Sequence, residues 1–242
     1  MARVCITGLV FLFSIQLAGA KDFSKSYTLV PGGQIFIENF LGDIDVKGFK
    51  GDSIEFVANK KGDDRDQIQI LDSSTEYRID IRLRPPLSPP GNARVDFEVR
   101  VPEGVEYNFT RISSFSGNVN ISGVAGMLSA ESVRGNLTLK DVKGLVNASS
   151  FSGNIQVDLG KAQNRSNMRF SSISGNIEVV APADLDAVVD ITCSSGLLKT
   201  DFPLEVQELR YGPARSARGR LGMGRQSLRI RSVTGRVNLV QK

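Results

Sequence analysis

Residues 128–157 read LSAESVRGNLTLKDVKGLVNASSFSGNIQV, and this stretch contains the pattern that decides the fold. Its glycines recur every nine residues, at Gly135, Gly144 and Gly153, with apolar residues two positions apart on both sides. Glycine adopts positive φ at little cost, so a regular glycine spacing indicates regular turns. Apolar residues two apart indicate strands with one buried face. The stretch therefore predicts a series of strand, turn, strand units.

The same unit recurs along most of the chain. Apolar residues lie seven, five and two positions before a glycine and two and four positions after it, and we expect all of them on the buried face. Asparagine follows alternate glycines, so two strands and about eighteen residues should make one full turn. The predicted structural corners are Gly42, Gly117, Asn118, Gly135, Asn136, Gly153, Asn154, Gly175, Asn176, Gly196 and Gly235.

Two all-β folds are compatible with this pattern. If successive turns stack, Phe115, Val133 and Phe151 form one column and the asparagines form another, which gives a narrow two-sheeted β-solenoid. If each Gly-Asn pair is instead the loop of a hairpin, the chain forms an antiparallel meander. We favour a single-domain, β-helix-like solenoid over residues 21–242, in which stacked asparagines and left-handed geometry stabilise the corners.

Two segments depart from the regular spacing. Between Gly51 and Phe109 the alternation is longer, as in residues 77–83 and 95–101, and we expect longer strands that form wider turns at the N-terminal end of the solenoid. Residues 209–225 are rich in glycine and arginine and replace a regular turn, so we expect a basic loop there.

The first twenty residues resemble a secretory signal peptide. Arg3 precedes an apolar run, and Ala18-Gly19-Ala20 has the small residues of a cleavage site. The apolar run is short for a membrane span, which needs about 20 residues, and no later stretch is longer. We therefore expect an exported protein that is periplasmic, on the cell surface or secreted, without a transmembrane segment in the mature chain. Cys193 then remains alone, and we expect a small buried side chain.

The composition limits the available chemistry. Histidine is absent, which excludes Ser-His and Cys-His catalysis and zinc sites with histidine ligands. Ser114, Ser150 and Ser172 are interpreted as hydrogen-bonding residues of the turns. Asp43 and Asp45 lie on one strand face but do not supply the six to eight oxygens that calcium requires. We predict no catalytic residue, no metal and no cofactor.

The net charge of +4 conceals a basic C-terminal segment. Residues 209–242 contain nine positive side chains and no acidic one. Such asymmetry favours an anionic partner, either an envelope polymer or a lipid surface, while another protein stays open as a partner. Nucleic acid is disfavoured because aromatic residues do not alternate with the basic ones. The candidate contacts are Arg210, Arg215, Arg218, Arg220 and Arg225, with a solvated loop of incidental charge as the alternative.

Several short motifs occur in a characteristic order. Residues 99–109 read VRVPEGVEYNF, Ser-x-Ser-Gly-Asn units begin at Ser114, Ser150 and Ser172, and EVVAPADLDAVV follows at 178–189. This order resembles the bacterial β-strand-repeat proteins that are labelled putative adhesins, a domain of unknown function. The resemblance covers nearly all of the mature chain. It implies a β-solenoid that is exported or faces the envelope, and it brings no established catalytic residues.

These features favour a non-catalytic surface for binding, adhesion or envelope structure. A regular stack gives broad, rigid faces without a deep pocket. Two alternatives stay open. One is an enzyme acting on polysaccharide, which would need two convergent carboxylates. The other is a structural or regulatory envelope component that pairs with partner strands through the ends of the solenoid.

Overall fold

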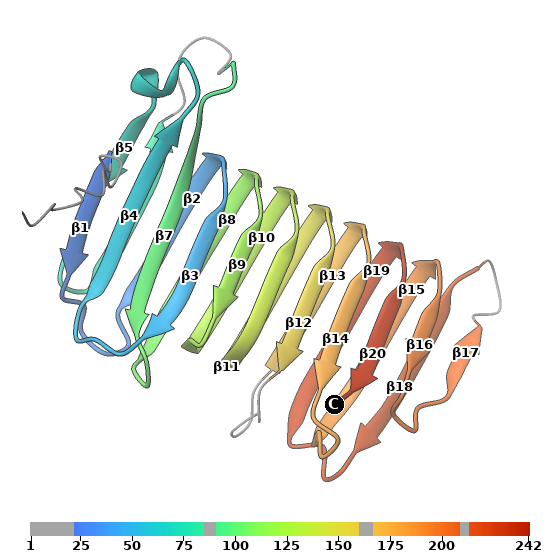
Figure 1. The fold of residues 1–242 in the computed structure, drawn as a ribbon. Coiled ribbons are helices and arrows are strands. Elements are labelled where there is room, and N and C mark those ends of the chain that lie inside the picture. The colour runs from blue at the N-terminus through green and yellow to red at the C-terminus, as the bar shows by residue number, and fades with distance from the viewer. Residues whose placement is uncertain (1–21, 85–90, 160–166, 209–212) are drawn as a thin grey trace, which may run out of the picture.

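The computed structural model describes residues 22–84, 91–159, 167–208 and 213–242. These residues form twenty β-strands and one 3-10 turn, η1 (Arg65–Gln67), and the described part of the chain contains no α-helix. The expected signal peptide and Arg210 lie outside the described residues. The strands form two facing layers, called sheet A and sheet B, that run along one elongated stack (Figure 1).

Sheet A contains the strands that pair in the following spatial order: β1 (Phe23–Tyr27), β4 (Ile54–Lys61), β7 (Arg94–Pro102), β3 (Ile44–Phe49), β9 (Val119–Ser122), the first part of β11 (Leu137–Ser152), β12 (Ile155–Leu159), β14 (Ile177–Ala181), β20 (Val237–Gln241) and β16 (Leu198–Thr200).

Sheet B lies opposite, and its spatial order is β5 (Gln69–Asp72), β6 (Arg78–Arg84), β2 (Gln34–Leu41), β8 (Glu106–Ser116), β10 (Ala125–Arg134), the last part of β11, β13 (Asn167–Ser174), β19 (Gln226–Thr234), β15 (Ala187–Ser195), β18 (Arg215–Leu221) and β17 (Val206–Glu208). Because β11 passes through both layers, the two sheets are continuous.

The central strands of both sheets pair in parallel. In sheet B, β10 is parallel to β8 on one side and to β11 on the other, and in sheet A, β11 is parallel to β9 and β12. A hairpin would have made these neighbours antiparallel. The antiparallel meander is therefore wrong for the repeats, and the prediction of an all-β, solenoid-like stack is confirmed.

The core is a single apolar layer between the sheets. Leu128 and Ala130 of β10 face Leu137 and Leu139 of β11, and all four are buried. The expectation that the residue two before each glycine is also buried is wrong, since side chains alternate along a strand. Counting by two from Leu128 reaches Ser132, so the next residue lies on the outer face. The affected residues are Phe40, Phe115, Val133, Phe151, Ile173 and Val233, which are exposed by 36% to 56%.

The first repeat of the chain lies inside the stack. β2 pairs with β6 on one side and β8 on the other, while β3 pairs with β7 and β9. The expected wider turns between Gly51 and Phe109 are present only as β6 and β7, which are parallel to β2 and β3. The prediction is wrong for β4 and β5, which pair antiparallel with their neighbours: β4 lies between β7 and the edge strand β1, and β5 is the edge strand beside β6.

The last repeat also lies inside the stack. β19 is inserted between β13 and β15, and β20 between β14 and β16. Figure 1 accordingly shows the C-terminus beside β14 and not at the end of the molecule. β15 then pairs with β18, which runs antiparallel, and β17 forms the edge. The expected loop over residues 209–225 is therefore wrong for residues 215–221, which form β18.

Candidate functional site

At the glycine corners, the backbones of successive turns of the stack come into contact. A Cβ atom added to Gly135 would lie 2.0 Å from the carbonyl oxygen of Gly117, and one added to Gly153 would lie 2.0 Å from that of Gly135. Gly153 does not have a left-handed φ, so close approach alone requires glycine there. At the C-terminal end, the glycines that contact each other are neighbours in the stack and not in the sequence. Gly196 contacts Gly235, and Gly235 contacts Gly175.

The asparagines beside these glycines form a ladder of hydrogen bonds. The side-chain oxygen Oδ1 of Asn118 accepts the backbone N–H of Asn136 at 3.0 Å, and the residues in this bond are eighteen positions apart. Asp43 occupies the same position in the first repeat and accepts the N–H of Asn118 at 2.7 Å. The acceptor oxygens are thus used within the stack. The later steps run from Asn136 to Asn154, from Asn154 to Asn176 and from Asn176 to the N–H of Arg236.

An inner polar row lies three positions before the glycines. Ser114 Oγ donates to the carbonyl oxygen of Gly42 at 3.0 Å, and the buried Cys193 Sγ lies 3.3 Å from that of Gly235. Burial raises the pKa of the Cys193 thiol, which keeps it protonated. The prediction that Cys193 is a small buried residue is confirmed. The equivalent donors Ser132 and Ser172 bond to Gly117 and Gly153.

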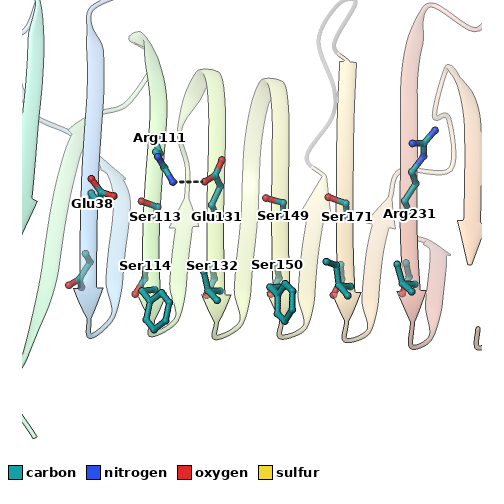
Figure 2. A pocket seen from close by; sticks show the side chains of 18 of the residues that line it. Glu38, Arg111, Ser113, Ser114, Glu131, Ser132, Ser149, Ser150, Ser171 and Arg231 are labelled. Carbon is teal, nitrogen blue, oxygen red and sulfur yellow. Dashed lines mark ion pairs between the residues drawn. The ribbon is translucent and has the colours of Figure 1, made fainter. Parts of the chain in front are cut away.

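A groove of about 820 Å³ crosses the outer face of sheet B. It runs from β2 through β8, β10, β11, β13 and β19 to β15, at right angles to the strands (Figure 2). Two rows of side chains line it. The apolar ridge consists of Phe40, Phe115, Val133, Phe151, Ile173 and Val233, and the polar row consists of Glu38, Ser113, Glu131, Ser149, Ser171 and Arg231.

The polar row has opposite charges at its two ends. Figure 2 shows Glu38 at one end and Arg231 at the other, with Ser113, Glu131, Ser149 and Ser171 between them. Glu131 forms an ion pair with Arg111, at 3.2 Å. Within the part of the chain that the structure describes, neither Glu38 nor Arg231 forms an ion pair within 4.0 Å, but Glu38 lies beside Arg82 of β6 and acts electrostatically on it.

The apolar ridge is aromatic at several positions. The rings of Phe40 and Phe115 stack with their centroids 5.2 Å apart and an interplanar angle of 8°. The guanidinium of Arg134 lies 6.0 Å from the centre of the Phe115 ring. Because the register of the sheet is constant here, each ridge residue lies beside the next one. The ridge is therefore a continuous apolar strip that crosses neighbouring strands of sheet B.

Residues 33–239 match the model of the family described as Toastrack DUF4097. The chain belongs to the Toastrack DUF4097 family. The resemblance to a repeat family of unknown function is thereby confirmed. A comparison with curated proteins gave no match.

Two solved structures resemble this Toastrack chain. The first is described as a putative cell adhesion protein from Clostridium sporogenes ATCC 15579, with 14% identity, a TM-score of 0.46, and coverage of 91% of this chain and 99% of the other. The second is described as a putative adhesin from Bacteroides fragilis NCTC 9343, with 14% identity, a TM-score of 0.42, and coverage of 90% of this chain and 96% of the other.

Sequence reasoning missed the groove because it assigned the apolar ridge to the core. The sequence did contain a signal for the groove, namely which positions of each strand fall on the buried face when side chains alternate. In β10, Leu128, Ala130 and Ser132 keep one strict period of two, whereas Glu131 and Val133 belong to the opposite face. Two side chains of every repeat therefore had to point outward, one polar and one apolar.

The predicted arginine contacts of this Toastrack chain lie away from the groove, on and after β18. Arg215 donates to the carbonyl oxygen of Gly196 at 3.1 Å and pairs with Glu208. Arg220 forms no ion pair with a described residue, and Arg210 is outside that part of the chain. Arg218 pairs with Asp190 at 3.0 Å, and Arg225 pairs with Asp186 at 3.4 Å.

The acidic pairs considered for a metal have other partners. Asp43 is part of the corner ladder, and Asp45 accepts a hydrogen bond from the side chain of Asn120 at 2.9 Å. Among the described residues, no three acidic or cysteine side chains gather as a metal site would require. The same residues include no helix long and apolar enough to cross a membrane.

Proposed function

We propose that this Toastrack chain is an exported, non-catalytic binding protein of the adhesion type, and that the groove of sheet B is its docking surface. The observation that carries the proposal is the continuity of the groove, in which an apolar ridge and a polar row both persist from β2 to β19. Parallel strands lie about 4.8 Å apart, so these six strands span about 24 Å. A strip of that length suits an extended partner surface.

Physical considerations support docking at this face. Exposed apolar side chains usually occur singly on soluble proteins, and contiguous ones mark interaction sites. The ridge side chains are held on a sheet with closely packed corners, because a carbonyl oxygen of the neighbouring turn lies directly beside each corner glycine. A rigid surface loses little conformational entropy when it binds.

Export and the absence of catalysis rest on the sequence. The first twenty residues have the order of a signal peptide, and the chain contains no histidine. The hydroxyls of Ser114, Ser132 and Ser172 donate to backbone carbonyls inside the stack, so these serines are engaged in structural bonds. The other serines of the groove, such as Ser149 and Ser171, have no histidine in the chain that could activate them, so we infer that the groove offers contacts and shape.

The basic edge supports a second, weaker contact with anionic envelope material. Arg218 and Arg225 are ion-paired, yet their side chains remain 72% and 71% exposed. Arg220 is exposed beside them on β18. Surface ion pairs of this kind contribute little, so a competing phosphate or sulfate group can displace the carboxylate.

The docking surface is tested by retention of the purified mature chain on cell envelopes. Phe115→Ser together with Phe151→Ser should abolish retention, because both changes remove exposed apolar area from the ridge. Met127→Ser is the matched control, since Met127 is exposed by 53% on β10 but does not line the groove. Equal retention of all three proteins would contradict the proposal.

A further inference from the structure

We infer that the partner of the groove is the groove of a second copy of this chain, so that binding is homophilic. The inference rests on the proposed function, because it takes the same surface as the docking site. It names the occupant from the order of side chains along the ridge and the polar row, both of which are self-complementary.

The pairing is generated by a two-fold axis that runs parallel to the strands between β10 and β11. Such an axis brings two sheet B faces together and reverses the order of strands in the partner. β10 then lies opposite β11 of the second copy, β8 opposite β13, and β2 opposite β19. Since the axis preserves position along the strands, ridge faces ridge and polar row faces polar row.

The ridge is complementary in size under this operation. Its aromatic residues are Phe40, Phe115 and Phe151, and its β-branched residues are Val133, Ile173 and Val233. The axis places each aromatic ring opposite a β-branched side chain. Large and small groups thus interdigitate, which is the arrangement that packed sheets use. The three pairs are Phe40 with Val233, Phe115 with Ile173, and Phe151 with Val133.

The polar row is complementary in charge under the same operation. Glu38 of one copy lies opposite Arg231 of the other, and the symmetry makes this contact twice. Ser113 lies opposite Ser171, and Glu131 lies opposite Ser149, so no two like charges meet within this row. In the next row along the strands the same operation places Arg111, which is ion-paired with Glu131, opposite Arg169. Glu131 keeps its ion pair with Arg111 within its own chain. The charges at the two ends of the polar row, Glu38 and Arg231, therefore meet their opposite in the second copy, although Glu38 also interacts with Arg82 of its own chain.

A second copy is favoured over other partners because one operation satisfies both rows. An unrelated protein or an extended glycan would need a separate match to the acidic end, the basic end and the alternation of large and small groups. A second copy supplies all three from the sequence already present. The geometry is also closed, since an isologous contact uses each groove once and yields dimers without fibres.

The first test is the mass of the purified mature chain, measured by sedimentation over a wide range of concentration. A monomer and dimer in equilibrium are expected, with weaker association at high salt because the end contacts are electrostatic. Phe115→Ser should remove the dimer, whereas Met127→Ser should leave it unchanged. A chain that stays monomeric at every concentration would overturn the inference.

A charge exchange provides the decisive test. Glu38→Arg alone and Arg231→Glu alone should each weaken the dimer by about tenfold, because each places two like-charge contacts in the interface. The double variant should restore the dimer, since the charges are then exchanged and complementary again. A double variant as weak as the singles would overturn the inference. Glu178→Arg with Lys199→Glu, on the outer face of sheet A, is the matched control and should change nothing.

The outcomes separate this inference from the proposed function. If the wild-type chain is monomeric but envelope retention is lost in the Phe115→Ser, Phe151→Ser variant, a different envelope component occupies the groove and only the homophilic inference fails. If dimers form and respond to the charge exchange while envelope retention is unaffected, self-association holds and the adhesive function fails.

Discussion

At Gly153 an alanine methyl group would lie 2.0 Å from the carbonyl oxygen of Gly135, which is backbone and cannot move aside. The backbone of Gly153 is not left-handed, so the cost of Gly153→Ala comes from contact alone. We expect the substitution to lower the free energy of unfolding by about 3 kcal/mol or more. Urea unfolding followed by circular dichroism measures this change.

Gly104→Ala is the control for backbone strain. Gly104 has a φ of +79°, but an added Cβ would have no atom within 4 Å. Left-handed geometry costs a residue with a Cβ roughly 1–2 kcal/mol, so Gly104→Ala should cost less than Gly153→Ala. The reverse order would show that the glycine spacing is set by turn conformation and not by contact between layers.

Asp72 connects the free edges of the two sheets at the N-terminal end. It lies on β5 of sheet B and accepts hydrogen bonds from Lys25 at 2.5 Å and Tyr27 at 2.9 Å, both on β1 of sheet A. Burial acts to raise the pKa of Asp72, but the bonds from Lys25, Ser74 and Tyr27 outweigh it and lower the pKa to about 2. The carboxylate therefore stabilises the fold in its charged form.

The lowered pKa predicts how stability depends on pH. The contribution of Asp72 is fully present above the ordinary pKa of 3.8 and is lost as the pH falls toward about 2. It is worth about 2 kcal/mol. Asp72→Asn should lower the free energy of unfolding at pH 7 by that amount. It should also reduce the loss of stability between pH 4 and pH 2, as measured by urea unfolding from pH 7 to pH 2.

Asp66→Asn is the comparison variant for this measurement. The side chain of Asp66 is 91% exposed and its ion pair with Arg65 is long, at 3.9 Å. Its removal should leave both the stability and the pH dependence unchanged. An Asp72→Asn protein with the wild-type acid limb would show that another group controls unfolding in acid.

At the scale of the element, the arginines of β18 differ in their contacts. The Arg215 guanidinium donates to the carbonyl oxygen of Gly196, the last corner of the stack, and its side chain is only 30% exposed. Arg215→Ala leaves that carbonyl without its donor and should lower the free energy of unfolding by about 1–3 kcal/mol. Thermal unfolding measures the loss.

Arg220→Ala should have the opposite profile. Because Arg220 is exposed and forms no ion pair with a described residue, its removal should change stability by less than about 0.5 kcal/mol. Binding to vesicles that contain anionic lipid should weaken, as measured by co-sedimentation. For the previous variant, an Arg215→Ala protein with unchanged stability would show that the hydrogen bond from Arg215 to the carbonyl oxygen of Gly196 does not stabilise this corner.

The repeat could be predicted at this scale because its signals are local. Leu137 and Leu139 after Gly135 show alternation and a corner within a few residues, and both leucines are buried as expected. The position of β2 and β19 inside the stack could not be predicted. Both strands end at a corner glycine in the same alternation as the central repeats, although Asp43 and Arg236 stand where the central repeats have asparagine. Parallel pairing offers the same register to any turn of the stack. Their place depends on contacts between segments 60 to 75 residues apart.

At the scale of the whole molecule, the last segment of the chain completes an inner layer. A chain that ends at Arg225 lacks β19 and β20, so β15 and β16 lose the strands to which they pair in parallel. We expect fast hydrogen exchange at the amides of β15 and β18, with protection retained in β8 and β10. Mass spectrometry of exchanged peptides measures this difference.

The comparison is a chain that ends at Val240, which keeps most of β20 and should retain protection in β15. If the chain ending at Arg225 also protects β15, then β15 and β16 can dock directly on β13 and β14. In that case the inner position of β19 would not be needed for the C-terminal end to fold.

The corner ladder determines how a protein of this kind can change its length. Asn136 bonds to Asn118, and Asn154 bonds to Asn136, at the same separation of eighteen residues. One more copy of that unit between β10 and β11 would meet identical neighbours on both faces, and neither end of the stack would be altered. Each added copy would extend the molecule by about 4.8 Å. Duplication at the C-terminus would instead place the new copy where β15 already lies. Relatives that differ in reach should therefore differ in the number of central units.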